Sequence, residues 1–207
     1  ILDKSDRPGG MMIGAIPSER MPEDVLTREI DMLTLTGMNF QYGKELGKNV
    51  SVEGLKNDYD AVFLAPGLWA GRLLKIPGMK QAKVTDTLSF LTKSRTKGKV
   101  GNRVLVIGGG SVASDVALVA QAAGAKETTV VCLESEQEMP CLPSERNEMV
   151  EKGIRIENGW GPKEIISKTK MACMSCTAVF DAHRKFAPAF DKARTREFEF
   201  DEVIIAV

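Results

Sequence analysis

The residues most clearly spaced for chemistry are three small ones in the pattern G-x-G-x-x-A. Gly108, Gly110 and Ala113 follow the apolar run "RVLVI" and open a helix-like run rich in alanine and valine. In a dinucleotide site the first glycine permits a tight turn, the second lets backbone approach a pyrophosphate, and the third small residue lets helix and strand pack closely. The spacing predicts that Gly108, Gly110, Ser111, Val112 and Ala113 bind phosphate at the start of a helix. A purely structural glycine turn is the alternative.

An acidic residue about 20 positions further on refines this prediction. The run "TTVVCLESE" is strand-like and ends near Glu134. An acid at this point hydrogen-bonds a ribose 2′-hydroxyl and repels a 2′-phosphate, whereas an NADP site favours arginine. We expect Lys126, Arg146 and Lys152 to lie away from the strand end, and we therefore favour NAD over NADP. The alternative role of Glu134 is a solvated charge at the end of the strand.

The elements around the motif alternate as in an α/β fold. After the strand "RVLVIG" come the helix "SVASDVALVAQAAG", the strand "ETTVVCLE", a loop and helix over residues 136–153, and the strand "IRIENGW". This succession is typical of a parallel sheet with right-handed crossovers. The remaining chain reads as strands without helices, in "EIISKT", "MACMSCTAVFD" and "TREFEFDEVIIAV". We expect an antiparallel excursion before the closing strand.

The residues before the motif form a separate region. We expect a helix from Met21 or Pro22 to Gly37, a short helix in "SVEGLKNDY", and strands in "MNFQYG" and "AVFLAPG". A second short helix in "VTDTLSFLTKS" and a solvated basic loop, "KSRTKGKVGNR", lead to the motif. We predict domains at 1–78 and 79–207.

Composition limits the function classes. Among 207 residues, 28 are basic and 28 acidic, which leaves no global field to attract nucleic acid. No apolar run reaches the roughly 20 residues that cross a bilayer, and no signal peptide is evident, so we expect a cytoplasmic protein with reduced cysteines. Because "ILDK" and "DEVIIAV" both look like strands at the chain ends, we expect a segment of a longer polypeptide.

Several motifs, taken in order, resemble one family. "GGMMIGAIPSERMP" is similar to its stretch of glycine pair, G-I-P and L-P, "YDAVFLAPG" to Y-D-A-V-x-L-A-T-G, "VIGGGSVASD" to V-I-G-G-G-N-V-A-M-D, and "SEQEMP" to S-x-x-E-M-P. From Leu2 to Val207 the chain resembles the FAD-dependent pyridine nucleotide oxidoreductases of the glutamate synthase small-subunit type. Pro66 and Ser111 depart from the family pattern.

The resemblance implies an architecture and an activity. It implies a Rossmann-like, three-layer NAD(P)-binding domain inserted in a partial FAD-binding domain, with the family's first glycine motif absent from these residues. By resemblance, Asp3 holds the adenosine ribose of FAD, and Gly9 and Gly10 approach the flavin. Hydride would pass from NAD(P)H to FAD, bound by the intact protein, and electrons would leave to iron–sulfur clusters or a partner subunit. Hydride transfer of this kind needs no acid or base from the protein, so we expect no catalytic side chain. We expect no metal ligand, because there is no second C-x-x-C pair and only one histidine.

Two other functions remain open. The isolated segment could be a catalytically inert dinucleotide-binding or interaction module whose chemistry belongs to missing regions. A dithiol reductase would need Cys173 and Cys176 to approach within disulfide distance, but residues three apart in a strand point to opposite faces. The lone histidine, His183, is expected at a solvated hairpin tip.

Overall fold

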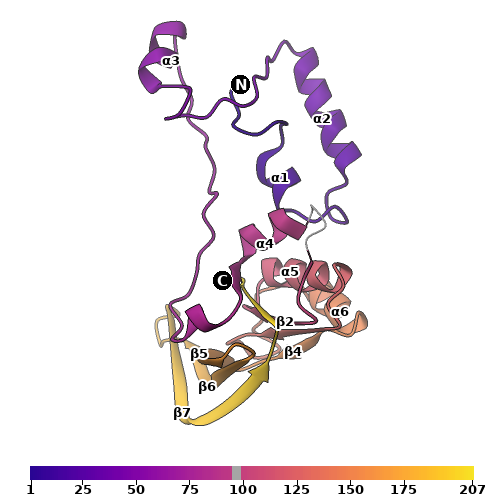
Figure 1. Ribbon diagram of the computed structural model, residues 1–207, viewed down its shortest axis with the longest axis vertical. Coiled ribbons are helices and arrows are strands. Elements are labelled where there is room, and N and C mark those ends of the chain that lie inside the picture. The colour runs from indigo at the N-terminus through magenta and orange to yellow at the C-terminus, as the bar shows by residue number, and fades with distance from the viewer. Residues whose placement is uncertain (95–98) are drawn as a thin grey trace. The chain divides into compact units, whose positions relative to one another are not determined.

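The computed structural model describes residues 1–94 and 99–207 and divides them into two compact units. The units are Ile1–Trp69 and Ala70–Val207 (Figure 1). The centre of the predicted basic loop, residues 95–98, lies outside the described residues. The division into cofactor domains after residue 78 stays a prediction, because compactness does not identify which cofactor a unit binds.

The second unit is built on a five-stranded parallel sheet, in the order β1-β8-β2-β3-β4. Residues rich in valine and isoleucine form its central strands, which are buried on both faces, as parallel sheets require. The register sets Val104 beside Thr128 on one side and Glu202 on the other. The strands are β1 (Val84–Asp86), β2 (Arg103–Ile107), β3 (Glu127–Val131), β4 (Arg155–Glu157) and β8 (Glu202–Ile205).

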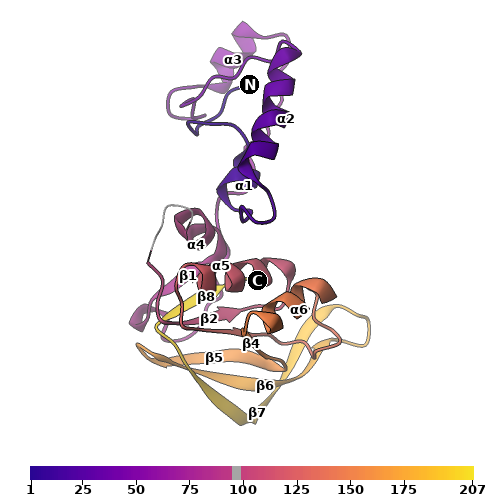
Figure 2. The same ribbon diagram turned by 90° about the vertical axis from the view of Figure 1, so that its right-hand side faces the viewer.

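This unit is built of three layers, as predicted. Three helices cover one face of the parallel sheet, and an antiparallel sheet of β5, β6 and β7 covers the other (Figure 2). Leu105, Ile107 and Val131 pack with Met171 and Phe198 between the two sheets. These elements are α4 (Thr87–Ser94), α5 (Ser111–Ala122), α6 (Pro143–Glu151), β5 (Trp160–Ser167), β6 (Lys170–Phe180) and β7 (Phe186–Glu199).

Strand β1 was not predicted. Its three residues pair in parallel with β8, Thr85 lying opposite Ile204, and α4 begins directly afterwards. Asp86 caps α4, since its carboxylate accepts a hydrogen bond from the Ser89 amide at 2.9 Å. The segment before β1 contains the short 3-10 helix η1 (Met79–Gln81), which lies against strand β5 of the antiparallel sheet. The Pro77 carbonyl fixes this segment by accepting from the Ile165 amide at 2.8 Å.

The first unit carries α1 (Gly10–Gly14), α2 (Glu23–Leu35) and α3 (Val52–Asp58). The helix predicted from Met21 or Pro22 to Gly37 is confirmed as α2, which Pro22 precedes and which carries acids in its first turn. The Ser51 hydroxyl caps α3 by accepting from the Gly54 amide at 3.0 Å.

Two strands predicted in the first unit are wrong. Of residues 38–43, only Gln41 makes a bridge, to Leu2. Residues 61–67 have no regular secondary structure, and the side chain of Phe63 is 93% exposed. Their apolar composition favours a strand, but a strand forms only where a second one supplies its hydrogen bonds, and the described residues of this unit offer none.

Candidate functional site at the carboxyl edge of the parallel sheet

Gly108 makes the tight turn that follows β2. Its φ of +137° is one that side-chain-bearing residues rarely adopt, and a Cβ added to it would stand 2.1 Å from the Ala206 carbonyl oxygen. Its amide donates to the Val131 carbonyl at 2.9 Å. The turn is thus held against the carboxyl ends of β3 and β8, where ligands bind in open parallel sheets.

The next residues fit a pyrophosphate. Gly110 is the N-cap of α5, and a Cβ added there would meet no atom within 4 Å. The Gly110 carbonyl accepts from the Ala113 amide at 2.9 Å, and Ala113, in the first turn of α5, is buried at 1% exposure. The amides of Ser111 and Val112 belong to the first turn, where helical amides have no intrahelical acceptor and the helix dipole is positive. Open space, free amides and positive potential therefore coincide.

Glu134 lies beside this turn. The chain leaves β3 after Val131 and bends, and the half-buried Glu134 carboxylate comes so close to Gly109 that a Cβ there would stand 2.9 Å from Oε2. Three donors fix the Glu134 main-chain carbonyl: the amide of Gly159 at 3.1 Å, the side-chain Nδ2 of Asn158 at 3.1 Å and the Cys132 thiol at 3.7 Å. The acid is thus held next to the glycine turn.

Asn158 is a positioning residue that sequence reasoning missed. It was read as part of the strand "IRIENGW", but β4 ends at Glu157. Its side chain bonds both the Glu134 carbonyl and the Cys132 sulfur, at 3.1 and 3.2 Å. Asn-Gly is a turn dipeptide, and that signal would have placed Asn158 in the loop.

The loop after β3 returns to the glycine turn through Cys141. The Cys141 amide donates to the Gly109 carbonyl at 3.2 Å. Burial raises the pKa of the Cys132 thiol to about 12, with a further increase from the Glu134 carboxylate. Burial also raises the pKa of the Cys141 thiol. Both sulfurs therefore stay protonated near neutral pH.

Arg146 corrects one of our expectations. We expected it to lie away from the end of the second strand, but its guanidinium forms an ion pair with Glu136, two residues after Glu134. The cause is the return of the loop to α6, whose first turn carries Arg146. A cation is therefore present at the edge of the sheet that carries Glu134.

The cysteine pair of β6 does not form a redox disulfide in this structure. Cys173 and Cys176 are both free thiols. Cys173 is fully buried between the sheets, where burial raises the pKa of its thiol to about 12, and Cys176 lies in a partly exposed position. His183 is exposed in the turn between β6 and β7, as predicted. No cluster of three or more potential metal-ligating side chains occurs among residues 1–94 and 99–207.

The three residues expected to hold FAD belong to the first unit. The Asp3 carboxylate accepts from the Ser5 amide at 2.9 Å, and the Asp3 amide donates to the Gln41 carbonyl at 3.0 Å. Gly9 packs against Leu26, and Gly10 begins α1 with open space where a Cβ would project. Their role toward FAD stays a prediction.

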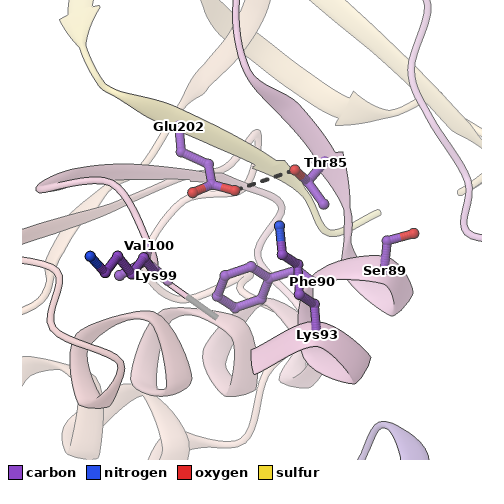
Figure 3. Close-up of a pocket in the computed structure, with 7 residues that line it drawn as sticks. All are labelled: Thr85, Ser89, Phe90, Lys93, Lys99, Val100 and Glu202. Carbon is purple, nitrogen blue, oxygen red and sulfur yellow. Dashed lines mark hydrogen bonds between the residues drawn. The ribbon is translucent and has the colours of Figure 1, made fainter. Parts of the chain in front are cut away.

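A pocket of about 240 Å³ lies at the opposite, amino edge of the parallel sheet (Figure 3). The pocket is lined by the acidic residue Glu202, which is 3% exposed. Its carboxylate accepts hydrogen bonds from Lys83 Nζ at 2.6 Å and from the Thr85 hydroxyl at 3.3 Å. The glycine turn and Glu134 follow the carboxyl ends of β2 and β3, so this pocket is separate from the candidate dinucleotide site. Its lining residues are Thr85, Ser89, Phe90, Lys93, Lys99, Val100 and Glu202.

Comparison with known proteins agrees with this geometry. Residues 14–207 match the family model described as pyridine nucleotide-disulphide oxidoreductase. The chain belongs to this family. This membership confirms the resemblance found in the sequence.

Curated relatives of this family member are named as oxidoreductase subunits. The chain is 36% identical over 155 residues to the NADPH-Fe(3+) oxidoreductase subunit beta of Geobacter sulfurreducens. This match covers 72% of the chain and 23% of the relative. The chain is 32% identical over 165 residues to the NAD-dependent dihydropyrimidine dehydrogenase subunit PreT of Escherichia coli, covering 78% and 40%. It is 32% identical over 169 residues to the putative glutamate synthase [NADPH] small chain of Cereibacter sphaeroides, covering 75% and 40%. The chain therefore spans between 23% and 40% of the length of these relatives.

The solved structures confirm the fold. Mycobacterium tuberculosis FprA in complex with NADPH matches with a TM-score of 0.83 at 16% identity, over 100% of this chain and 63% of FprA. Thioredoxin reductase of T. acidophilum matches with a TM-score of 0.62 at 17% identity, over 100% of this chain and 67% of that protein. Separately, none of the helices in the described part of the chain combines the length and apolarity needed to cross a membrane.

Proposed function

We propose that this chain is the NAD(P)H-binding part of a flavoprotein oxidoreductase. The observation that carries the proposal is the Glu134 carboxylate beside Gly109, at the head of α5. An acid on the second strand end and a glycine turn on the first are the two halves of a dinucleotide site, one for ribose and one for pyrophosphate.

The chain's own residues bind and orient the cofactor. Gly108 makes the turn, Gly110 leaves room for the phosphates, and the amides of Ser111 and Val112 donate to them. Ala113 lets α5 pack closely on the sheet. When bound, the nicotinamide supplies hydride and FAD accepts it, so that no acid or base from this chain is needed.

The local charges support a preference for NAD over NADP. Residues 132–146 contain four acids and one base, Arg146, which is already paired with Glu136. A 2′-phosphate placed near Glu134 would meet net negative charge, whereas a 2′-hydroxyl could donate to the carboxylate. The names of the relatives include both NADPH and NAD, so this preference rests on the chain's own residues. The acids are Glu134, Glu136, Glu138 and Glu145.

The remaining assignments concern the intact protein. We infer that residues 1–78 contribute to an FAD-binding domain, with Asp3, Gly9 and Gly10 toward the flavin, and that 79–207 form the NAD(P)-binding domain. Electrons would leave to iron–sulfur clusters or a partner subunit. The relatives named as oxidoreductase subunits support this inference. An inert dinucleotide-binding module is the alternative, and a purified chain that binds NADH but carries no flavin absorbance near 450 nm would favour it.

Gly110 offers a sharp test. Because an added Cβ meets no atom and the φ of −85° suits any residue, Gly110→Asp should fold normally. It places a carboxylate where the pyrophosphate would lie. Calorimetric titration with NADH should show a loss of affinity of at least about 100-fold at an unchanged melting temperature. Equal NADH affinity in both proteins would contradict the proposed site.

A further inference from the structure

The bend that carries Glu134 is tied to the residues that lead into β5. The Trp160 amide donates to the Cys132 carbonyl at 2.9 Å, and the Gly159 amide donates to the Glu134 carbonyl at 3.1 Å. These two bonds lie on either side of Leu133 and fix the main chain there. They leave the side chain of Leu133 to be held by packing.

The Leu133 side chain meets an aromatic ring from β7. Gly161 lies in β5 and is buried, and Leu133 and Phe190 are half-buried. A Cβ added to Gly161 would stand 2.6 Å from Leu133 Cδ2 and 2.5 Å from Phe190 Cε1. The two side chains therefore close over the bare Cα of Gly161, and a larger residue there would displace one of them. We call Leu133, Gly161 and Phe190 the clamp.

Neighbouring side chains of the bend have different partners. Leu133 packs into the clamp, whereas the Oε2 atom of Glu134 approaches Gly109 of the glycine turn. Because a rigid peptide unit joins residues 133 and 134, a rotation of the bend that releases Leu133 also swings the Glu134 carboxylate. A functional side chain keeps its geometry only where the packing around it restricts its movement. The clamp therefore sets the direction of the acid through the residue before it.

We propose that Phe190 is a positioning residue for cofactor selectivity, which holds Glu134 at the ribose 2′-hydroxyl by clamping Leu133 on Gly161. This inference rests on the proposed function. A firmly held carboxylate is a strong acceptor for the 2′-hydroxyl and opposes a 2′-phosphate, whereas a loosely held one does less of both. The preference for NADH over NADPH therefore depends on a ring that belongs to the antiparallel sheet.

The experiment is calorimetric titration of the full 207-residue chain and its Phe190→Leu variant with NADH and with NADPH. Leucine keeps an apolar side chain but lacks the Cε1 and Cζ atoms that reach Gly161, so the variant should fold and still release Leu133. NADH affinity should fall about three- to tenfold, part of the value of a charged hydrogen bond, and NADPH affinity should stay within about twofold. Phe186→Leu is the matched control, because it makes the same change in β7 at a 65% exposed ring that packs against Phe180.

A double-mutant cycle tests whether Phe190 acts through the acid. In a Glu134→Ala background, Phe190→Leu should change NADH affinity by less than about twofold, because the group that Phe190 positions is gone. An equal loss in both backgrounds would overturn the inference, since Phe190 would then affect binding by another route. Thermal denaturation checks that each variant is folded at the temperature of the titration.

The outcomes separate this inference from the proposed function. If Glu134→Ala lowers NADH affinity but Phe190→Leu has no more effect than Phe186→Leu, the inference is overturned while the dinucleotide site stands. The inference is also overturned if Phe190→Leu weakens NADH and NADPH equally, as a general loosening of the domain would. If the parent chain binds neither cofactor, the proposed function fails and the inference falls with it.

Discussion

Glu134 closes on the glycine turn so tightly that a Cβ on Gly109 would stand 2.9 Å from its carboxylate Oε2. The same Cβ would stand 2.9 Å from the Cys132 Cβ, an atom that cannot move without the backbone. Gly109→Ala should therefore displace Glu134 and weaken NADH binding about 10-fold, while costing about 1–2 kcal/mol of unfolding free energy.

Gly110→Ala is the matched comparison for Gly109→Ala. Because its Cβ meets no protein atom, its unfolding free energy should stay within about 0.5 kcal/mol of the parent value. Urea denaturation and NADH titration of both variants distinguish crowding of Glu134 from crowding of the phosphate site. Equal stability of the two variants would show that Gly109 is not confined as described.

Asn158 should affect the affinity for the cofactor without contacting it. Asn158→Ala removes the side-chain donor at 3.1 Å from the Glu134 carbonyl, which leaves the bend that carries the acid less firmly held. NADH binding should weaken by about three- to tenfold, as expected for one hydrogen bond. Asn49→Ala is the control, since Asn49 makes similar bonds to Glu45 and Gly43 in the first unit. An equal loss in both variants would argue for a general effect on folding.

The buried thiol of Cys173 should make stability fall at high pH. Its pKa is about 12 in the folded chain, against an ordinary value of 9.0, so between these two values the unfolded chain releases the proton first. Below pH 9 the thiol is protonated in both states and no stability is lost. Above pH 9 the unfolding free energy should decrease with a contribution of about 1.4 kcal/mol per pH unit from this thiol.

Urea denaturation of the parent chain and Cys173→Ala at several values between pH 8 and about 10.5 measures this contribution. The substitution should lower stability at every pH through lost packing, but its curve should fall less steeply above pH 9. Parallel curves would contradict the assignment. The same burial should block labelling of Cys173 by a thiol reagent at pH 8 until the chain unfolds.

The Lys83–Glu202 pair at the amino edge of the sheet should contribute more than an exposed pair. Lys83→Met leaves the carboxylate of Glu202, a residue 3% exposed, with the Thr85 hydroxyl and the Gly101 amide, each at 3.3 Å, as its donors among the described residues. Because Lys83 itself is half exposed, we expect a loss of about 1–3 kcal/mol rather than the full cost of breaking a buried pair.

Lys170→Met provides the control for that loss. Lys170 is about as exposed as Lys83, and it lies 3.0 Å from Glu197, but that carboxylate is itself 55% exposed. Its loss should cost less than about 0.5 kcal/mol. If urea denaturation gives equal losses for the two lysines, burial of Glu202 does not strengthen its pair.

Local signals in the sequence were sufficient for most of the second unit. The glycine motif, the apolar strands and the strand-rich tail predicted the parallel sheet, the helix α5 and the antiparallel excursion, and the structure confirms them. Strand β1 was not predicted, because its three residues are too few to show a periodic hydrophobic pattern and depend on pairing with β8. The strand predicted at 61–67 failed for the opposite reason, since apolar composition does not supply a partner.

Long-range contacts explain what the sequence analysis missed in the site. The Gly108 turn, Gly110 and Glu134 are local in sequence or fixed by the spacing of the fold, and they could be predicted. The return of the loop through Cys141 to Gly109, and with it the arrival of Arg146 near Glu136, depends on how ten residues fold back. No periodicity encodes such a return.

The most direct test of the dinucleotide site is the titration of the parent chain and Glu134→Arg with NADH and with NADPH at matched ionic strength. An acid beside the glycine turn should bind NADH more tightly, and an arginine in its place should accept the 2′-phosphate and reverse the order. Reversal of the preference would place residue 134 at the ribose. If neither cofactor binds to the parent chain, or if Glu134→Arg leaves the ratio of the two affinities unchanged, this account of the site is contradicted.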